Sequence, residues 1–329
     1  MKRIAALDDY LDLWRSCGDW GRIAPPVELV TFQDHLADEG ALAARLRDFE
    51  IVLAWREKTP FPASLIAKLS KLEFIATMGH VNRSIDVVAA GRRGIPVSGT
   101  LPDLFPVAEL AWGLMLALAR NIALEDRRTR LGGTWQTTIG TELRGRTLGI
   151  VGLGRIGGEV ARMAAGFGME VIAWSRSLTA ERCAQWGDVR PVQKDELMRR
   201  SDFIVIALAG GAGTAGIIGA REIALMKETA YLVNISRAST VDQKAMLAAL
   251  TEGRIAGAGL DVFDAEPLPR DHPLLALDNV VIHPHMGNAV RFTQEQHAEQ
   301  IIENIQAWLD GKPIRLLDET GHAAELAAS

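Results

Sequence analysis

The feature that most constrains the fold of this chain is a glycine pattern, Gly-x-Gly-x-x-Gly, at residues 152–157. An apolar run of strand length, residues 147–151, stands before it, and apolar side chains after it recur at helical spacing as far as Gly168. A second apolar run, residues 170–174, predicts another strand. A strand, tight turn, helix and strand in this order are typical of a dinucleotide-binding unit, whereas the glycines alone would fit any glycine-rich turn.

Each glycine of this segment has a distinct physical task. The first allows a tight turn, the second lets a pyrophosphate approach the backbone, and the third lets the helix pack closely on the strand. The helix N-terminus adds N–H donors and the positive end of its dipole. The candidate cofactor contacts in this segment are Gly152, Gly154, Arg155, Ile156 and Gly157.

The end of the second strand indicates which nicotinamide cofactor binds. NAD sites usually carry an acidic residue there, which binds the ribose 2′-hydroxyl. This chain instead has Ser175 and Arg176, with no acid beside them. A guanidinium would bind a 2′-phosphate, which a carboxylate would repel. NADP(H) is therefore favoured and NAD(H) stays possible, because Arg176 could also be an ordinary surface arginine.

Length and composition fit a cytoplasmic enzyme of two domains. Of the 329 residues, 48% are hydrophobic and 23% are charged, so extended disorder is not expected. A net charge of −5 argues against a nucleic-acid partner, and the apolar run 110–119 is too short to cross a membrane. The two cysteines, Cys17 and Cys183, have no metal-binding spacing. The N-terminus becomes acidic at Asp8 and Asp9 and lacks the apolar stretch of a secretory signal.

Strand and helix patterns alternate along most of the chain, which predicts an α/β fold with parallel sheets. Outside the glycine segment, the expected strands are 29–32, 51–54, 74–77, 95–97, 203–208, 230–235, 255–262 and 280–282. The expected helices include 41–49, 64–72, 106–130 and 290–309. The tail from about Thr320 carries no such pattern and is expected to be loose.

Three polar residues, Arg237, Glu266 and His285, each lie just beyond the C-terminal end of a predicted strand. In open parallel sheets, ligands collect at this edge. Arginine offers a fork of donors to a carboxylate, and a carboxylate beside a histidine orients the ring and stabilises its protonated form. Taken singly, each residue could equally have a packing or surface role. Together, and downstream of a dinucleotide segment, they predict a catalytic set.

Several segments of the chain resemble the D-isomer-specific 2-hydroxyacid dehydrogenases. They are the glycine pattern, the Ser-Arg pair after Tyr-Leu-Val-Asn, the segment Gly-Leu-Asp-Val-Phe with Glu-Pro beyond it, and the turn Pro-His-Met-Gly. The resemblance weakens in the first 60 residues and in the tail. It implies a flavodoxin-like substrate-binding domain from residues 1–101 and 291–329. A Rossmann dinucleotide-binding domain, residues 102–290, would be inserted between these parts, with the active site in the cleft.

The same resemblance implies hydride transfer between a nicotinamide cofactor and a 2-oxo acid/D-2-hydroxy acid pair, such as glyoxylate or hydroxypyruvate. It assigns Arg237 to the substrate carboxylate and carbonyl, Glu266 to the histidine, and His285 to proton transfer. Asp261 would contact the nicotinamide end of the cofactor. Further cofactor candidates are Ile235, Ser236 and Gly287, and the substrate candidates besides Arg237 are Arg56, Gly79 and His80.

The resemblance also implies a homodimer that forms through the predicted helix 106–130. This helix carries more apolar side chains than one buried face needs, although a fully buried core helix would look the same. No metal and no macromolecular partner other than a second copy are expected.

Two departures from the family pattern bear on these expectations. Ala238 stands where the family usually has glycine, which matters only if the position needs a positive φ. The segment 78–86 resembles the glycine-rich segment that receives the substrate carboxylate, but it carries His80 and Arg83, which are unusual there. The identity of the substrate is therefore left open.

Four other functions stay open on the sequence alone. A metal enzyme could use His283, His285 and Glu266, although Pro284 between the histidines disfavours it. A formate dehydrogenase would pair its histidine with glutamine, whereas Glu266 stands here. The remaining two are a phosphoglycerate dehydrogenase and a dinucleotide-sensing binding protein of the corepressor type.

Overall fold

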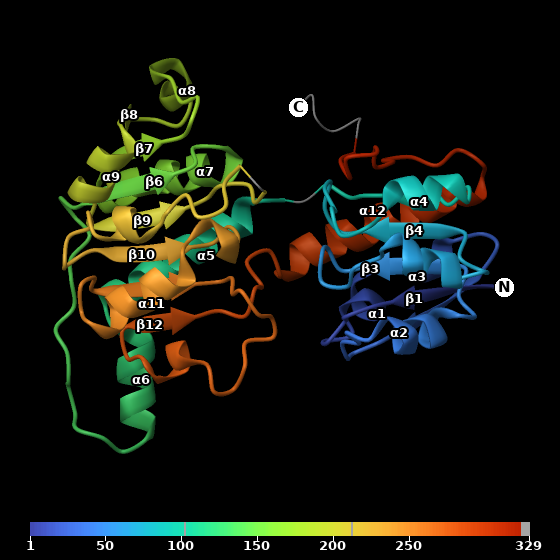
Figure 1. Cartoon of the computed structure of the whole chain (residues 1–329), viewed down its shortest axis with the longest axis horizontal. Coiled ribbons are helices and arrows are strands. Elements are labelled where there is room, and N and C mark those ends of the chain that lie inside the picture. Colours follow the sequence, from blue (N-terminus) through green and yellow to red (C-terminus); the bar gives the residue numbers. More distant parts are fainter. Residues whose placement is uncertain (102, 212, 324–329) are drawn as a thin grey trace. The chain divides into compact units, whose positions relative to one another are not determined.

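The computed structural model describes residues 1–101, 103–211 and 213–323. The chain forms two compact units, each built around a parallel sheet (Figure 1). We call residues Leu104–Asn288 the central unit, and Met1–Asp103 together with Ala289–Ser329 the split unit. The α/β fold with parallel sheets expected from the alternating pattern is therefore confirmed.

The split unit contains a five-stranded sheet in the order β2-β1-β3-β4-β5, which is the order of flavodoxin-like folds. Its strands are β1 (Lys2–Ala6), β2 (Val27–Thr31), β3 (Ile51–Ala54), β4 (Phe74–Thr77) and β5 (Val97–Ser98). Its helices are α1 (Leu13–Cys17), η1 (Trp20–Arg22), α2 (Glu39–Leu46), α3 (Ala63–Lys68), α4 (Val87–Arg92) and α12 (Arg291–Leu309). Helix α12 comes from the far end of the chain and packs against α1 and β4.

The central unit contains a seven-stranded parallel sheet in the order β12-β11-β10-β9-β6-β7-β8. Its strands are β6 (Thr147–Val151), β7 (Glu170–Trp174), β8 (Val189–Pro191), β9 (Phe203–Ile206), β10 (Tyr231–Asn234), β11 (Gly257–Leu260) and β12 (Val280–Ile282). From β6 the chain moves outward to β7 and β8, then returns to β9 on the other side of β6. This reversal is the Rossmann switch point, where dinucleotides bind at the carboxyl ends of the strands.

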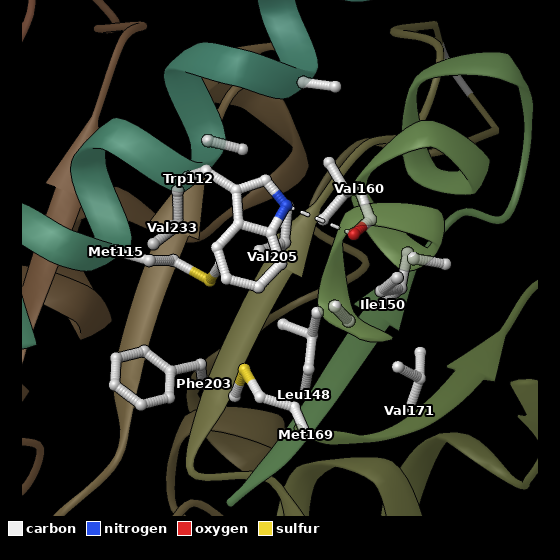
Figure 2. Close-up of a cluster of buried hydrophobic side chains, with 14 of the residues drawn as sticks. Trp112, Met115, Leu148, Ile150, Val160, Met169, Val171, Phe203, Val205 and Val233 are labelled. Carbon is white, nitrogen blue, oxygen red and sulfur yellow. Dashed lines mark hydrogen bonds between the residues drawn. The ribbon is translucent and has the colours of Figure 1, made fainter. Parts of the chain in front are cut away.

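Helices cover both faces of the central sheet. They are α5 (Phe105–Ala119), α6 (Ile122–Arg130), α7 (Arg155–Ala164), η2 (Ala165–Phe167), α8 (Ala180–Ala184), α9 (Lys194–Arg200), α10 (Ala220–Ile223), η3 (Ala238–Thr240), α11 (Gln243–Thr251) and η4 (Pro273–Ala276). Successive side chains of a strand point to opposite faces of the sheet and pack into two different cores. Phe203 and Val205 of β9 pack in the core under α5 and α7, while Ile204 and Ile206 pack in the core on the opposite face. In Figure 2, Trp112 of α5 lies over the first core and donates from Nε1 to the carbonyl oxygen of Val160 at 3.2 Å.

The predicted helix 106–130 is wrong as one continuous element. The structure has two helices, α5 and α6, which are bent by 61° at Arg120 and Asn121. Asn121 adopts a left-handed conformation with φ 52°, which asparagine tolerates better than most residues. The apolar side chains of α5, including Leu114 and Met115, are buried against the central sheet. They therefore form part of the core of the central unit.

The described part of the predicted tail is better ordered than expected. Residues 320–323 are not loose, because the backbone N–H of Ala323 donates to His80 O at 2.9 Å. Just before this segment, the backbone N–H of Leu317 donates to Val97 O at 2.8 Å. The rest of the predicted tail, 324–329, and residue 102 at the predicted domain boundary lie outside the described residues. No single helix in the described ranges is long and apolar enough to cross a membrane.

Candidate active site

The glycine segment links β6 to the first turn of α7 and has the geometry of a dinucleotide site. Gly152 has φ +103°, and a Cβ at Gly157 would lie 2.1 Å from Gly152 O, so both positions require glycine. Gly154 is the N-cap of α7 and has no atom within 4 Å of where its Cβ would be. Arg155 and Ile156 form the first turn behind it. A pyrophosphate fits this open position, because it would receive helix N–H groups where a side chain is absent.

The end of β7 lies beside the glycine segment. Ser175 Oγ accepts a hydrogen bond from the backbone N–H of Leu153 at 3.0 Å, which ties the two loops together. Arg176 is exposed, and its Nη2 would lie 3.0 Å from a Cβ built on Gly213. The guanidinium therefore packs over the backbone of the loop after β9, at the carboxyl edge of the sheet.

The end of β10 positions Arg237 through a buried asparagine. Asn234 Oδ1 accepts from the backbone N–H and the hydroxyl of Ser236, both at 3.0 Å, and its Nδ2 donates to Arg237 O at 3.1 Å. Ile235 and Ser236 are buried. A Cβ on Gly210 would lie 2.5 Å from Arg237 Cγ, so this glycine leaves room for the arginine. Neither Asn234 nor Gly210 was expected from the sequence, although Asn234 lies near the end of one predicted strand and Gly210 follows another.

The substitution of alanine for the family's usual glycine after Arg237 causes no backbone strain. Ala238 begins the helix η3, and it is not among the residues with positive φ. The departure seen in the sequence therefore has no structural cost at this position.

Glu266 and His285 are brought together at the ends of β11 and β12. His285 Nδ1 lies 2.6 Å from Glu266 Oε2, while Glu266 Oε1 accepts the backbone N–H of Phe263 at 2.9 Å. The two side chains are 31% and 32% exposed, so the imidazole is held on one side and accessible on the other. His285 also has φ 52°, a conformation that is rare for non-glycine residues and that clusters at functional sites.

A second carboxylate–histidine pair shapes the turn that carries His285. Asp261 is 2% exposed, and its Oδ1 lies 2.6 Å from His283 Nδ1. The same carboxylate accepts the backbone N–H groups of Met286 at 3.0 Å and Gly287 at 3.1 Å. The histidines 283 and 285 thus pair with different carboxylates. The described ranges contain no group of three side chains suited to a metal ion, and the metal-enzyme alternative gains no support.

The remaining substrate candidates lie at the carboxyl edge of the split unit. Arg56 follows β3 with φ 52°, and Gly79 follows β4 with φ +87°. Asn82 joins their two loops, because its Nδ2 donates to Arg56 O at 2.6 Å and to Thr77 Oγ1 at 2.8 Å. His80 stands in the same loop, and its carbonyl oxygen is bonded to the C-terminal segment.

Comparison with known proteins agrees with this geometry. The family description "D-isomer specific 2-hydroxyacid dehydrogenase, NAD binding domain" matches residues 112–287. A glyoxylate reductase from Korarchaeum cryptofilum is 38% identical over 309 residues, covering 92% of this chain and 87% of that protein. The crystal structure of a phosphoglycerate oxidoreductase from Vibrio cholerae has a TM-score of 0.89 at 31% identity, covering 94% of this chain and 100% of the other.

A further similar structure was solved with ligands. The NADPH-dependent glyoxylate/hydroxypyruvate reductase of Sinorhizobium meliloti, in complex with NADP and malonate, has a TM-score of 0.76 at 29% identity and covers 98% of both chains. With the glycine segment, the switch point and the family match in agreement, the chain belongs to the D-isomer-specific 2-hydroxyacid dehydrogenases and is an NAD(P)-dependent oxidoreductase.

Proposed function

We propose that this enzyme reduces a small 2-oxo acid, glyoxylate or hydroxypyruvate, to the D-2-hydroxy acid. The observation that carries the proposal is the hydrogen-bonded pair of Glu266 and His285, which follows Arg237 at the same edge of the central sheet. A glyoxylate reductase and a glyoxylate/hydroxypyruvate reductase among the similar proteins support the choice of substrate. The decisive experiment measures kcat/KM for a panel of 2-oxo acids with NADPH and NADH in parallel.

In this mechanism the residues of the chain bind, orient and protonate the substrate. Arg237 holds the substrate carboxylate and polarises the carbonyl oxygen. It therefore contributes both by orienting the substrate and by its positive charge. Protonated His285 donates its proton to that oxygen as negative charge develops there, and Glu266 keeps the ring oriented. In the reverse direction the neutral imidazole accepts the proton. Bound at this edge, the nicotinamide supplies the hydride chemistry.

We propose that residues 102–290 form the dinucleotide-binding domain and that the cofactor is held by the residues named from the sequence. The glycine segment would bind the pyrophosphate. Ile235, Ser236, Asp261 and Gly287 would shape the nicotinamide end, and the hydrogen bonds of Asp261 to the following turn suit that task. Arg176 favours NADP(H) over NAD(H), and the Sinorhizobium meliloti reductase is NADPH-dependent.

Residues 1–101 and 291–329 would then form the substrate-binding domain. Arg56, Gly79 and His80 lie at the carboxyl ends of β3 and β4, where open parallel sheets bind ligands. A guanidinium and backbone N–H groups at this edge suit the anionic end of a 2-oxo acid.

Two alternatives are decided by the same panel. The similarity to the phosphoglycerate oxidoreductase from Vibrio cholerae favours a second candidate substrate, 3-phosphoglycerate. Faster turnover of 3-phosphoglycerate or its 2-oxo product than of glyoxylate and hydroxypyruvate would select that activity. Binding of NADPH without turnover of any 2-oxo acid would instead select the dinucleotide-sensing function.

We further propose that two copies of this chain associate through α6 and the segment after it. Ile122, Leu131, Trp135 and Ile139 are 55%, 79%, 75% and 96% exposed, although each is a large apolar side chain. A groove beside Ile139, lined in part by Leu116 and Phe167, continues this apolar surface. Sedimentation at micromolar concentration should show a dimer, and a W135D/I139D variant should sediment as a monomer. A wild-type monomer would contradict this assembly.

A cytoplasmic location stays a prediction of the composition.

A further inference from the structure

A buried histidine of α12 is hydrogen-bonded to the residue that holds Gly79, one of the substrate candidates. His297 is 1% exposed, and its Nδ1 lies 2.7 Å from the hydroxyl oxygen of Thr100, which is fully buried. The two residues are 197 positions apart in the chain, so only the return of α12 to the split unit brings them together. The described residues offer no hydrogen-bond partner to His297 Nε2.

Thr100 transmits this contact to the backbone of Gly79. Its Oγ1 accepts the N–H of Gly79 at 2.8 Å, and its own N–H donates to Gly79 O at 2.9 Å. Gly79 has φ +87°, a backbone conformation that glycine adopts more readily than any other residue. Fixing it there costs conformational entropy, because a glycine backbone is free to adopt many other conformations. One threonine therefore fixes both polar groups of Gly79, and His297 is the remaining partner of its hydroxyl.

The charge of Arg56 acts on the imidazole of His297. Burial, together with the positive charge of Arg56, lowers the pKa of His297 to about 4, so the ring is neutral near pH 7. The loop of Arg56 is in turn bonded to the Gly79 loop through Asn82. A neutral ring at this position supports Gly79 through Thr100 without attracting the guanidinium, whereas a carboxylate would pair with Arg56 and compete with an anionic substrate.

We propose that His297 is a positioning residue for substrate binding: through Thr100 it holds Gly79, and with it the loop that Asn82 bonds to the Arg56 loop, in place for the 2-oxo acid. The inference rests on the proposed function of this edge of the split unit. His297 belongs to the split unit, whereas the cofactor segment and the Glu266–His285 pair belong to the central unit. Its effect is therefore expected in the KM for the 2-oxo acid.

The test compares variants of His297 and Thr100 in the full-length enzyme. H297L removes the imidazole, and T100V removes the hydroxyl with little change of volume. Each should raise the KM for glyoxylate about five- to tenfold, as expected for one lost hydrogen-bonded contact, while kcat changes by less than about threefold. H297N places an amide near the position of Nδ1 and should return the KM to within about twofold of wild type.

A matched control separates positioning from general stability. Ile305 lies on the same helix, is fully buried, and packs among apolar side chains of the split unit's core. I305A should lower the melting temperature at least as much as H297L and leave the KM for glyoxylate unchanged. The dissociation constant of NADPH, followed by fluorescence, should stay within about twofold of wild type in all variants.

Two results would overturn the inference while leaving the proposed function intact. One is an unchanged KM in H297L beside an active wild type. The other is a parallel change of KM, kcat and melting temperature in H297L and I305A, which would make His297 a core residue only. Absence of wild-type turnover with every 2-oxo acid would instead overturn the proposed function, and the positioning role with it.

Discussion

His285 and Glu266 face each other across the ends of β12 and β11, with 2.6 Å between Nδ1 of the ring and Oε2 of the carboxylate. The carboxylate is fixed on its other oxygen by the backbone N–H of Phe263. Both oxygens of the carboxylate are therefore bonded within the chain, and only the opposite edge of the ring is left to exchange a proton with a substrate.

A double-mutant cycle on this pair should show that its members act as one unit. H285A should lose on the order of 10²–10⁴ in kcat for 2-oxo acid reduction, because the general acid is gone. E266Q keeps the shape but removes the negative charge, and it should lose about tenfold or more. In the H285A background, E266Q should have almost no further effect, since its role acts through the ring. NADPH affinity serves as the control and should stay nearly constant. Additive losses would contradict the assigned coupling.

The candidate catalytic set could be proposed from the sequence because each member lies in a loop at the C-terminal end of a strand. Parallel strands buried on both faces are continuous apolar runs, so β3, β4, β6, β7 and β12 have the bounds expected from the sequence. In a parallel sheet the carboxyl ends of all strands lie at the same edge. Arg237, Glu266 and His285 are therefore expected at that edge.

Other features could not be predicted because they depend on tertiary contacts or on weak local signals. Strand β1 begins with two charged residues, Lys2 and Arg3, and β8 is a three-residue edge strand that ends in Pro191. The sequence at the bend between α5 and α6 contains no glycine or proline that would predict a helix end. Asn121 adopts the left-handed conformation there instead. The contact of Thr100 with His297 joins distant parts of the chain, and nothing in either local sequence points to the other.

Cofactor preference should depend on Arg176. NADPH should be used with a higher kcat/KM than NADH, and R176A should lose that preference. One charge-assisted contact to the 2′-phosphate is worth about 1.5–3 kcal/mol, which corresponds to a roughly 10- to 150-fold loss with NADPH. R182A removes a neighbouring exposed arginine that bonds to Ser177, and it should change the ratio of NADPH to NADH use by less than about threefold. Equal or better use of NADH by the unmutated enzyme would refute the assignment.

The C-terminal segment should contribute to the stability of the split unit through Gly321. This residue has φ +78°, its carbonyl oxygen accepts the N–H of Asn82, and a Cβ on it would lie 2.6 Å from Asn82 O. Gly311 is the matched control, with φ +74° and no atom within 4 Å of its Cβ position. G311A should lose about 1 kcal/mol of unfolding free energy from backbone strain alone, and G321A roughly 1–3 kcal/mol more from the clash. Equal losses in urea unfolding would show that the segment does not constrain the loop.

Acid should destabilise the enzyme through His297. The folded-state pKa of this buried histidine is about 4, against an ordinary value of 6.5, so the unfolded chain binds a proton that the folded chain excludes. The resulting stability is fully present above about pH 6.5 and is lost as the pH falls from 6.5 towards 4, by on the order of 3 kcal/mol in all. H297N carries no titratable group there, so its unfolding free energy should fall less between pH 7 and pH 4.5 than that of wild type. Urea unfolding of both proteins across this range measures the difference, and two parallel curves would mean that His297 is protonated in the folded state.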